Sequence, residues 1–217
     1  MKLQHIQILT NNIQQTAKFY NDILELPIIE KTSKSVTIKA GNSILKFVEN
    51  PDFNSMYHFA FNIPENKLEE AIAWCNDKID LVIIEDKRII ANFETWNANA
   101  VYFYDNNGNL LEFIARHDLD NSQIKQFSSK SILNISEIGL ANEDPIELGT
   151  QLIEDYNLSF FAKNFNSEAF AAIGDDEGLL IIVKPNRNWY PTQTPSKSNK
   201  TEIRIENNND SIHLSFE

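Results

Sequence analysis

The chain has 217 residues, 42% of them hydrophobic and 23% charged, which is typical of a soluble globular protein and excludes bulk disorder. Its net charge of −12 argues against nucleic acid and anionic membranes as partners, because both need a basic face. No apolar run is long enough to cross a bilayer, and Gln4 and His5 interrupt the first apolar run, so we expect no signal peptide. Cys75 is the single cysteine, which favours a reducing, cytoplasmic location.

The first 116 residues predict one order of elements twice. Residues 2–9 alternate between apolar and polar side chains as a strand does, and Asn12 sits where it can cap a helix over 13–24. The other strands of this unit are predicted over 27–32, 34–40 and 44–49. In the second unit the predicted elements are a strand over 56–63, a helix over 65–77, and strands over 81–85, 87–93, 99–104 and 109–115. Residues 1–116 therefore predict a domain of two βαβββ modules.

The pattern begins a third time after a polar stretch over 117–130, which we interpret as a linker. Residues 135–163 align with 3–31 without a gap. The remaining predicted elements are strands over 168–173 and 178–183 and a hairpin of 201–206 with 211–216. Residues 131–217 thus predict a partial module plus a hairpin. The fold class is α+β, with repeated βαβββ modules in a curved mixed sheet.

Three residues stand out as candidate metal ligands: His5 and His58 on the first strands of units one and two, and Glu112 on the last strand of unit two. Strand alternation points each of them away from the bulky face that should pack under the helices. Two imidazoles and one carboxylate meeting in one concavity would form a facial triad with open positions for substrate.

Four segments resemble the vicinal oxygen chelate superfamily, which includes glyoxalase I, fosfomycin-resistance proteins, bleomycin-binding proteins and extradiol ring-cleaving dioxygenases. They are residues 1–5, 19–24, 58–61 and 104–113. The resemblance implies that His5, His58 and Glu112 hold one divalent ion, which could be Fe, Mn, Ni, Co or Zn. It also implies a small-molecule substrate and makes a homodimer plausible.

Two departures from this family pattern bear on the function. Glyoxalase I has a fourth ligand, a glutamate, where this sequence has Lys46, which argues against glyoxalase I chemistry. In unit three, Glu137 stands in the place of His5 and Ile181 in the place of Lys46. A second site of Glu137 and His213 would lack a third ligand. We therefore expect unit three to carry no complete metal site and to cover or extend the first domain.

Several other residues have two interpretations each. Lys46 is either a substrate anchor or a strand-edge lysine whose amine reaches solvent. Tyr102 and Tyr104 are either proton donors to a bound oxyanion or pocket-wall residues. Residues 187–190, in a Pro-flanked loop, either latch the partial module onto the first domain, which we favour, or cover the pocket. Arg116 and His117 are expected at the surface.

The sequence thus favours a metal-dependent enzyme whose substrate chelates the ion through neighbouring oxygens. Ring cleavage of a catechol-like substrate is the first expectation, because three ligands remain, and it rests on the resemblance. The alternative is a protein of the same fold that sequesters a small molecule or drug without metal or turnover.

Overall fold

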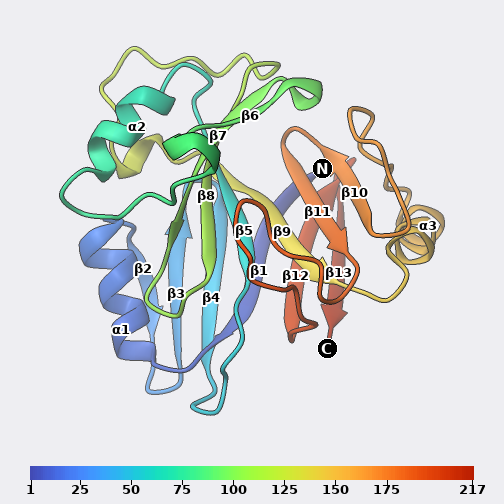
Figure 1. Cartoon of the computed structure of the whole chain (residues 1–217). Coiled ribbons are helices and arrows are strands. Elements are labelled where there is room, and N and C mark those ends of the chain that lie inside the picture. Colours follow the sequence, from blue (N-terminus) through green and yellow to red (C-terminus); the bar gives the residue numbers. More distant parts are fainter.

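Strands dominate the computed structural model, which describes all residues from Met1 to Glu217. Thirteen strands form one mixed sheet, and three α-helices pack on the outer side of the strands (Figure 1). The predicted α+β class with repeated modules is confirmed. None of the helices has the length and apolar character needed to cross a membrane.

The first module follows the prediction closely. Its elements are β1 (Lys2–Thr10), α1 (Ile13–Lys18), a π-helical turn (Phe19–Ile23), β2 (Ile28–Lys31), β3 (Ser35–Ala40) and β4 (Ser43–Glu49). The Asn12 side chain accepts hydrogen bonds from the backbone N–H groups of Gln14 and Gln15, as an N-cap residue does. The predicted start of this helix is confirmed.

The second module departs from the prediction in its middle. Its elements are β5 (His58–Ile63), α2 (Leu68–Cys75), β6 (Ala91–Phe93), β7 (Ala98–Tyr104) and β8 (Leu110–Arg116), with short 3₁₀ turns at Glu85–Lys87 and Glu94–Trp96. The predicted strand over 81–85 is absent, and only Leu81 forms an isolated bridge, to Phe103. Asp86 and Lys87 have positive φ angles, which turn the chain and end any extended run there.

The remaining elements are β9 (Asn134–Ala141), α3 (Pro145–Tyr156), β10 (Phe170–Asp175), β11 (Gly178–Val183), β12 (Thr201–Asn207) and β13 (Asp210–Phe216). A 3₁₀ turn at Ser129–Ser131 precedes β9. Residues 117–128, within the stretch that we interpret as a linker, form no helix or strand. The linker is nevertheless attached to α2, since the Phe127 amide donates to Glu70 and the Phe127 ring is buried.

The modules pair in an order that the sequence did not predict. Strand β1 pairs with β12 over five residues of register and with β9 only through Leu3 and Ile135. Strand β5 instead pairs antiparallel with β9. The first module therefore joins the carboxyl-terminal hairpin, and the second module joins the third. In Figure 1, β9 lies between β5 and β11. Strand β9 of the third module thus lies between the first strands of modules one and two.

Two hydrophobic cores lie on opposite faces of the strands. Phe59, Phe61 and Phe113 belong to the larger core under the helices. Ala60 and Ile114, on the opposite face, belong to a smaller core that lines the concave side. This is the division that strand alternation predicted for β5 and β8, and it aims His58 and Glu112 into the concavity.

Candidate functional site

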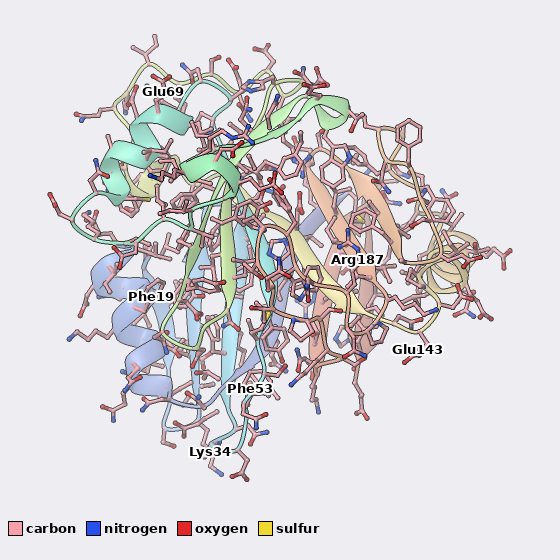
Figure 2. All side chains as sticks on the ribbon, viewed as in Figure 1. Phe19, Lys34, Phe53, Glu69, Glu143 and Arg187 are labelled. Atoms are coloured by element: carbon pink, nitrogen blue, oxygen red, sulfur yellow. The ribbon has the colours of Figure 1, made fainter.

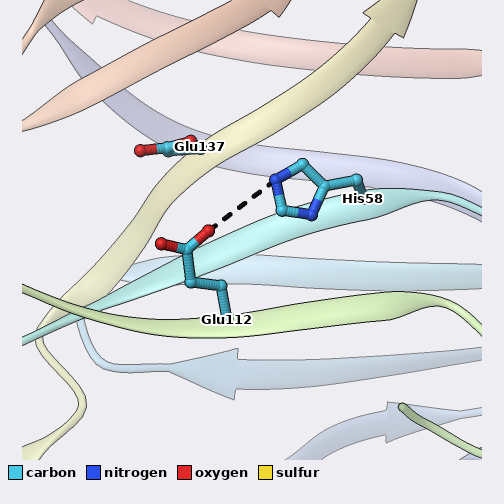
Figure 3. Close-up of side chains that lie close together, drawn as sticks. All are labelled: His58, Glu112 and Glu137. Carbon is cyan, nitrogen blue, oxygen red and sulfur yellow. Dashed lines mark ion pairs between the residues drawn. The ribbon is translucent and has the colours of Figure 1, made fainter. Parts of the chain in front are cut away.

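Three buried side chains from two modules meet in the concavity between modules two and three. His58 lies on β5, Glu112 on β8 and Glu137 on β9, and one potential ligand atom from each lies within 4.8 Å of the others. His58 Nε2 is 3.8 Å from Glu112 Oε2, and Figure 3 shows Glu137 facing both from the neighbouring strand. Parallel pairing of β5 with β8 sets Ala60 opposite Glu112, which brings His58 and Glu112 to one face.

The backbone holds His58 in an orientation suited to a ligand. The Leu110 carbonyl oxygen is 3.1 Å from His58 Nδ1, so a proton on Nδ1 donates to it and Nε2 keeps its lone pair. Burial lowers the pKa of His58 from 6.5 to about 4. The ring is therefore neutral at pH 7, and neutral imidazole is the form that binds metals.

Burial makes ionisation of the two carboxyl groups costly. Burial raises the pKa of Glu112 well above its usual value, and the nearby charge of Glu137 raises it further. Burial also raises the pKa of Glu137, although Arg116 opposes that effect. Glu112 Oε1 is buried and has no hydrogen-bond partner. An acceptor left unpaired beside a second carboxylate and a neutral imidazole fits a divalent cation.

Arg116 is the buried cation nearest to this group. It lies on β8 on the same face as Glu112, is fully buried, and forms an ion pair with Glu137. Its Nε donates to Ser136 Oγ at 3.2 Å, and its guanidinium lies 5.6 Å from the centre of the Trp96 ring. The expected surface position for Arg116 was therefore wrong, because strand β8 is covered on both faces. His117, one residue later, is exposed as expected.

The three side chains open onto a cavity of about 250 Å³. Aromatic rings form most of its wall: Phe93, Trp96, Tyr102, Phe170, Trp189 and Tyr190. Ile181, Arg187, His58, Glu112 and Glu137 complete the lining. A mostly apolar cavity with a few convergent polar groups is the usual form of a small-molecule site.

The Pro-flanked loop after β11 supplies one wall of this cavity. The buried Trp189 ring lies 5.1 Å from the His58 ring, and Tyr190 packs edge-on against Tyr102 at 6.0 Å. Gly139 on β9 leaves room for the indole, since a Cβ there would lie 2.5 Å from Trp189 Cη2. The loop therefore lines the pocket, and the same contacts join the third module to the second, so both interpretations of residues 187–190 apply.

The structure does not bring His5 to His58 and Glu112. His5 lies on β1 opposite Arg204 of β12, and burial followed by the charges of Arg204 and Lys46 lowers its pKa. Lys46 lies on β4 opposite Gln7 and does not line the cavity. Because β1 pairs with the terminal hairpin, both residues lie outside this cavity. Glu137 takes the third place instead.

Of the two candidate tyrosines, only Tyr102 lines the cavity. Tyr102 is buried, pairs across β7 and β8 with Glu112, and lines the cavity. Burial, and then the charges of Glu112 and Glu137, raise its pKa well above 10. Tyr104 is 40% exposed and does not line the cavity.

Glu137 was the missed member of the site. The sequence alignment had already set it at the position of His5. Pairing β9 with β5 would have moved the expected third ligand from His5 to Glu137. The sequence alone does not indicate how the first strands of the three modules, β1, β5 and β9, are ordered in the sheet.

Comparisons with known proteins bear on the family and the fold of this chain. A metallothiol transferase, FosB, of Staphylococcus saprophyticus is 27% identical over 116 residues, which cover 51% of this chain and 74% of that protein. Among solved structures, a “putative dioxygenase” from Bacillus subtilis superposes with a TM-score of 0.63 at 14% identity, covering 90% of this chain and 68% of the other. Glyoxalase I from Zea mays superposes with a TM-score of 0.60 at 14% identity, covering 91% and 71%.

These two structures share the fold over about nine tenths of this chain. A family model for the Glyoxalase/Bleomycin resistance protein/Dioxygenase superfamily matches residues 2–113, about half of the chain. The chain therefore belongs to the Glyoxalase/Bleomycin resistance protein/Dioxygenase superfamily.

Proposed function

We propose that this protein is a metal-dependent enzyme acting on a small molecule, and that His58, Glu112 and Glu137 hold one divalent cation. One observation carries the proposal: three ligand atoms from three strands lie within 4.8 Å at the wall of a cavity, and one carboxylate oxygen there is buried without a partner. His5 is replaced by Glu137 in this proposed ligand set.

A metal bound by this set would supply a Lewis acid that stabilises negative charge on a substrate oxygen. The chain's own residues would do the rest. The Tyr102 hydroxyl keeps its proton at neutral pH, because its pKa is raised by burial and by the neighbouring carboxyl groups, so it can donate a hydrogen bond to a substrate oxygen. Trp189 and Tyr190 would limit the access of water from the loop side.

The donor set bears on the reaction class. The facial triad of non-haem Fe(II) oxygenases has two histidines and one carboxylate, whereas this group has one histidine and two carboxylates. Carboxylate-rich sites suit Mn, and an imidazole also admits Zn, Fe, Co or Ni. We therefore favour Lewis-acid chemistry on neighbouring substrate oxygens over the ring cleavage that the sequence suggested.

The residues that line the cavity also disfavour glyoxalase I activity. Lys46 has the place of the fourth ligand of glyoxalase I in the sequence, but it lies on β4 opposite Gln7 and does not line the cavity. In the cavity itself the corresponding place on β11 is occupied by Ile181, which offers no carboxylate. A fourth acidic ligand, or a base from that strand, is therefore missing from this set.

A binding protein without turnover is the second candidate, because the apolar wall of the cavity could hold a ligand in the absence of metal. The two candidates make opposite predictions about metal. The metal-dependent enzyme needs the cation for activity, whereas the binding protein retains its ligand after chelator treatment.

Elemental analysis of protein purified without chelator tests the proposal. We expect about one equivalent of a first-row metal in the wild type. Metal should be lost in His58→Ala and in Glu137→Gln, and kept in the matched control His5→Ala. Metal retained in His58→Ala, or lost only in His5→Ala, would contradict this ligand set. Absence of metal after anaerobic loading with Fe(II), Mn(II) and Ni(II) would favour the binding protein.

Oxygen uptake then separates the two reaction classes. Metal-dependent consumption of O2 with catechols would restore ring cleavage as the activity. Metal-dependent turnover of a chelating substrate without oxygen uptake would support Lewis-acid chemistry.

A further inference from the structure

A cation that the proposed metal chemistry does not use also lines the cavity. Arg187 belongs to the loop after β11, and its backbone is held by hydrogen bonds to Lys184 and Ser196. The residue is exposed, so it lies at the open end of the cavity rather than at its floor. Figure 2 labels it on the side of the molecule that carries β10 and β11.

The guanidinium of Arg187 has no acidic partner. It takes part in none of the ion pairs and in no side-chain hydrogen bond of the structure. It lies 4.9 Å from the centre of the Phe170 ring, which supports its position without using its N–H donors. Arg116, the other arginine near the site, already pairs with Glu137 and with Asp176. Arg187 is therefore the cavity cation that has donors to offer.

The wall between Arg187 and the carboxylates is aromatic. Six rings line the cavity, and Trp96, Trp189 and Tyr190 come from segments outside the regular strands. Aromatic walls favour flat apolar groups, which can stack on them or meet their edges. In a chain of net charge −12, an anion gains no attraction from the molecule as a whole, so a local cation decides whether it binds.

We propose that the cavity selects an aromatic anion, with the planar ring held by the aromatic wall and an acidic group paired with Arg187 at the open end. The identification of this molecule as the substrate rests on the proposed function, since it assumes that the other end of the ring reaches His58, Glu112 and Glu137. A planar guanidinium with five N–H donors matches a carboxylate, sulfonate or phosphate group.

A matched pair of probes tests this selection by titration calorimetry: naphthalene-2-sulfonate and its neutral analogue, methyl 2-naphthyl sulfone. A sulfonate is a poor metal ligand, so its binding reports on Arg187 rather than on the metal group. The titrations use the full chain, both treated with chelator and loaded with metal. We expect the wild type to bind the sulfonate about tenfold more tightly than the sulfone in both forms.

Arg187→Gln should abolish this preference and leave the affinity for the sulfone unchanged. Arg88→Gln, which removes an exposed arginine outside the cavity, should behave as the wild type. Tyr190→Leu should weaken both probes together, because it removes part of the aromatic wall and keeps the cation. Equal preference in the wild type and in Arg187→Gln, or no binding of either probe, would overturn the inference.

The outcome can be separated from that of the metal proposal. A protein that binds no metal but loses its sulfonate preference in Arg187→Gln would refute the proposed enzyme and keep the aromatic-anion site. A protein that binds one metal and keeps its sulfonate preference in Arg187→Gln would support the proposed metal site and refute the aromatic-anion site.

Discussion

The neutral, buried imidazole of His58 has an energetic consequence that pH can reveal. Its pKa is about 4 in the folded protein and 6.5 when exposed, because burial disfavours the charged ring. As the pH falls, His58 is therefore protonated at a higher pH in the unfolded chain than in the folded protein. Stability from His58 is complete above pH 6.5 and is lost as the pH falls through 6.5 towards 4.

We predict that chelator-treated wild type loses roughly 2–3 kcal/mol more unfolding free energy than His58→Gln between pH 7 and pH 4.5. Urea unfolding of both proteins at the two pH values measures the difference. The buried carboxyl groups titrate in both proteins, so their contribution largely cancels. Equal losses in the two proteins would show that His58 does not change its proton affinity on folding.

Cys75 allows a second test at the scale of one residue. Cys75 is the last residue of α2, and burial raises the pKa of its thiol from 9.0 to about 12. Because the thiolate is the reactive form, the native thiol should react with Ellman's reagent at pH 8 at least about a thousandfold more slowly than the unfolded chain. One equivalent should react promptly in urea. Rapid reaction of the native protein would show that α2 opens readily.

At the scale of elements, the loop after β11 depends on a glycine in the strand beneath it. A Cβ at Gly139 would lie 2.5 Å from Trp189 Cη2, closer than such contacts allow. We predict that Gly139→Ala destabilises the wild type by about 1–3 kcal/mol through overpacking. In a Trp189→Ala background the same substitution should cost less than roughly 0.5 kcal/mol. Denaturant unfolding of the wild type, the two single variants and the double variant measures this coupling. An equal loss of unfolding free energy in both backgrounds would show that the strain does not come from contact with Trp189.

The elements themselves were largely predictable, because local patterns specify them. Strand alternation located β5 and β8 and assigned their faces, and Asn12 marked the first residue before α1. The predicted strand over 87–93 begins only at Ala91, after a turn where the non-glycine residues Asp86 and Lys87 have positive φ angles. Positive φ angles are rare in residues other than glycine, so sequence patterns do not predict them.

The arrangement of the modules was not predictable from the same patterns. Strands β1, β5 and β9 each begin a module, and all three alternate apolar and polar side chains in the same way. This alternation predicts which face of a strand is buried, but it does not predict which strands are neighbours in the sheet. That choice determined the candidate site, since it joined Glu137 rather than His5 to His58. The partial third module, expected to carry no complete site, supplies one of the three proposed ligands.

At the scale of the whole molecule, this pairing leads us to predict that residues 1–116 do not form a self-sufficient domain. Without β9 and β12, the inner edges of β5 and β1 lose the strands that hydrogen-bond to them. Exposed edges of this kind pair with other chains or leave the sheet unstable. The proposed metal group would also lose Glu137.

We therefore predict that a 1–116 fragment fails to form a cooperatively unfolding monomer and binds metal at least about tenfold more weakly than the full chain. Circular dichroism during urea unfolding, light scattering and metal titration measure the three properties. The full chain with Glu137→Gln is the matched control, because it removes the ligand but keeps both edge partners: it should unfold cooperatively and bind metal weakly. A monomeric fragment that unfolds cooperatively and binds one metal tightly would restore the two-module domain that the sequence alone suggested, with His5 as its third ligand.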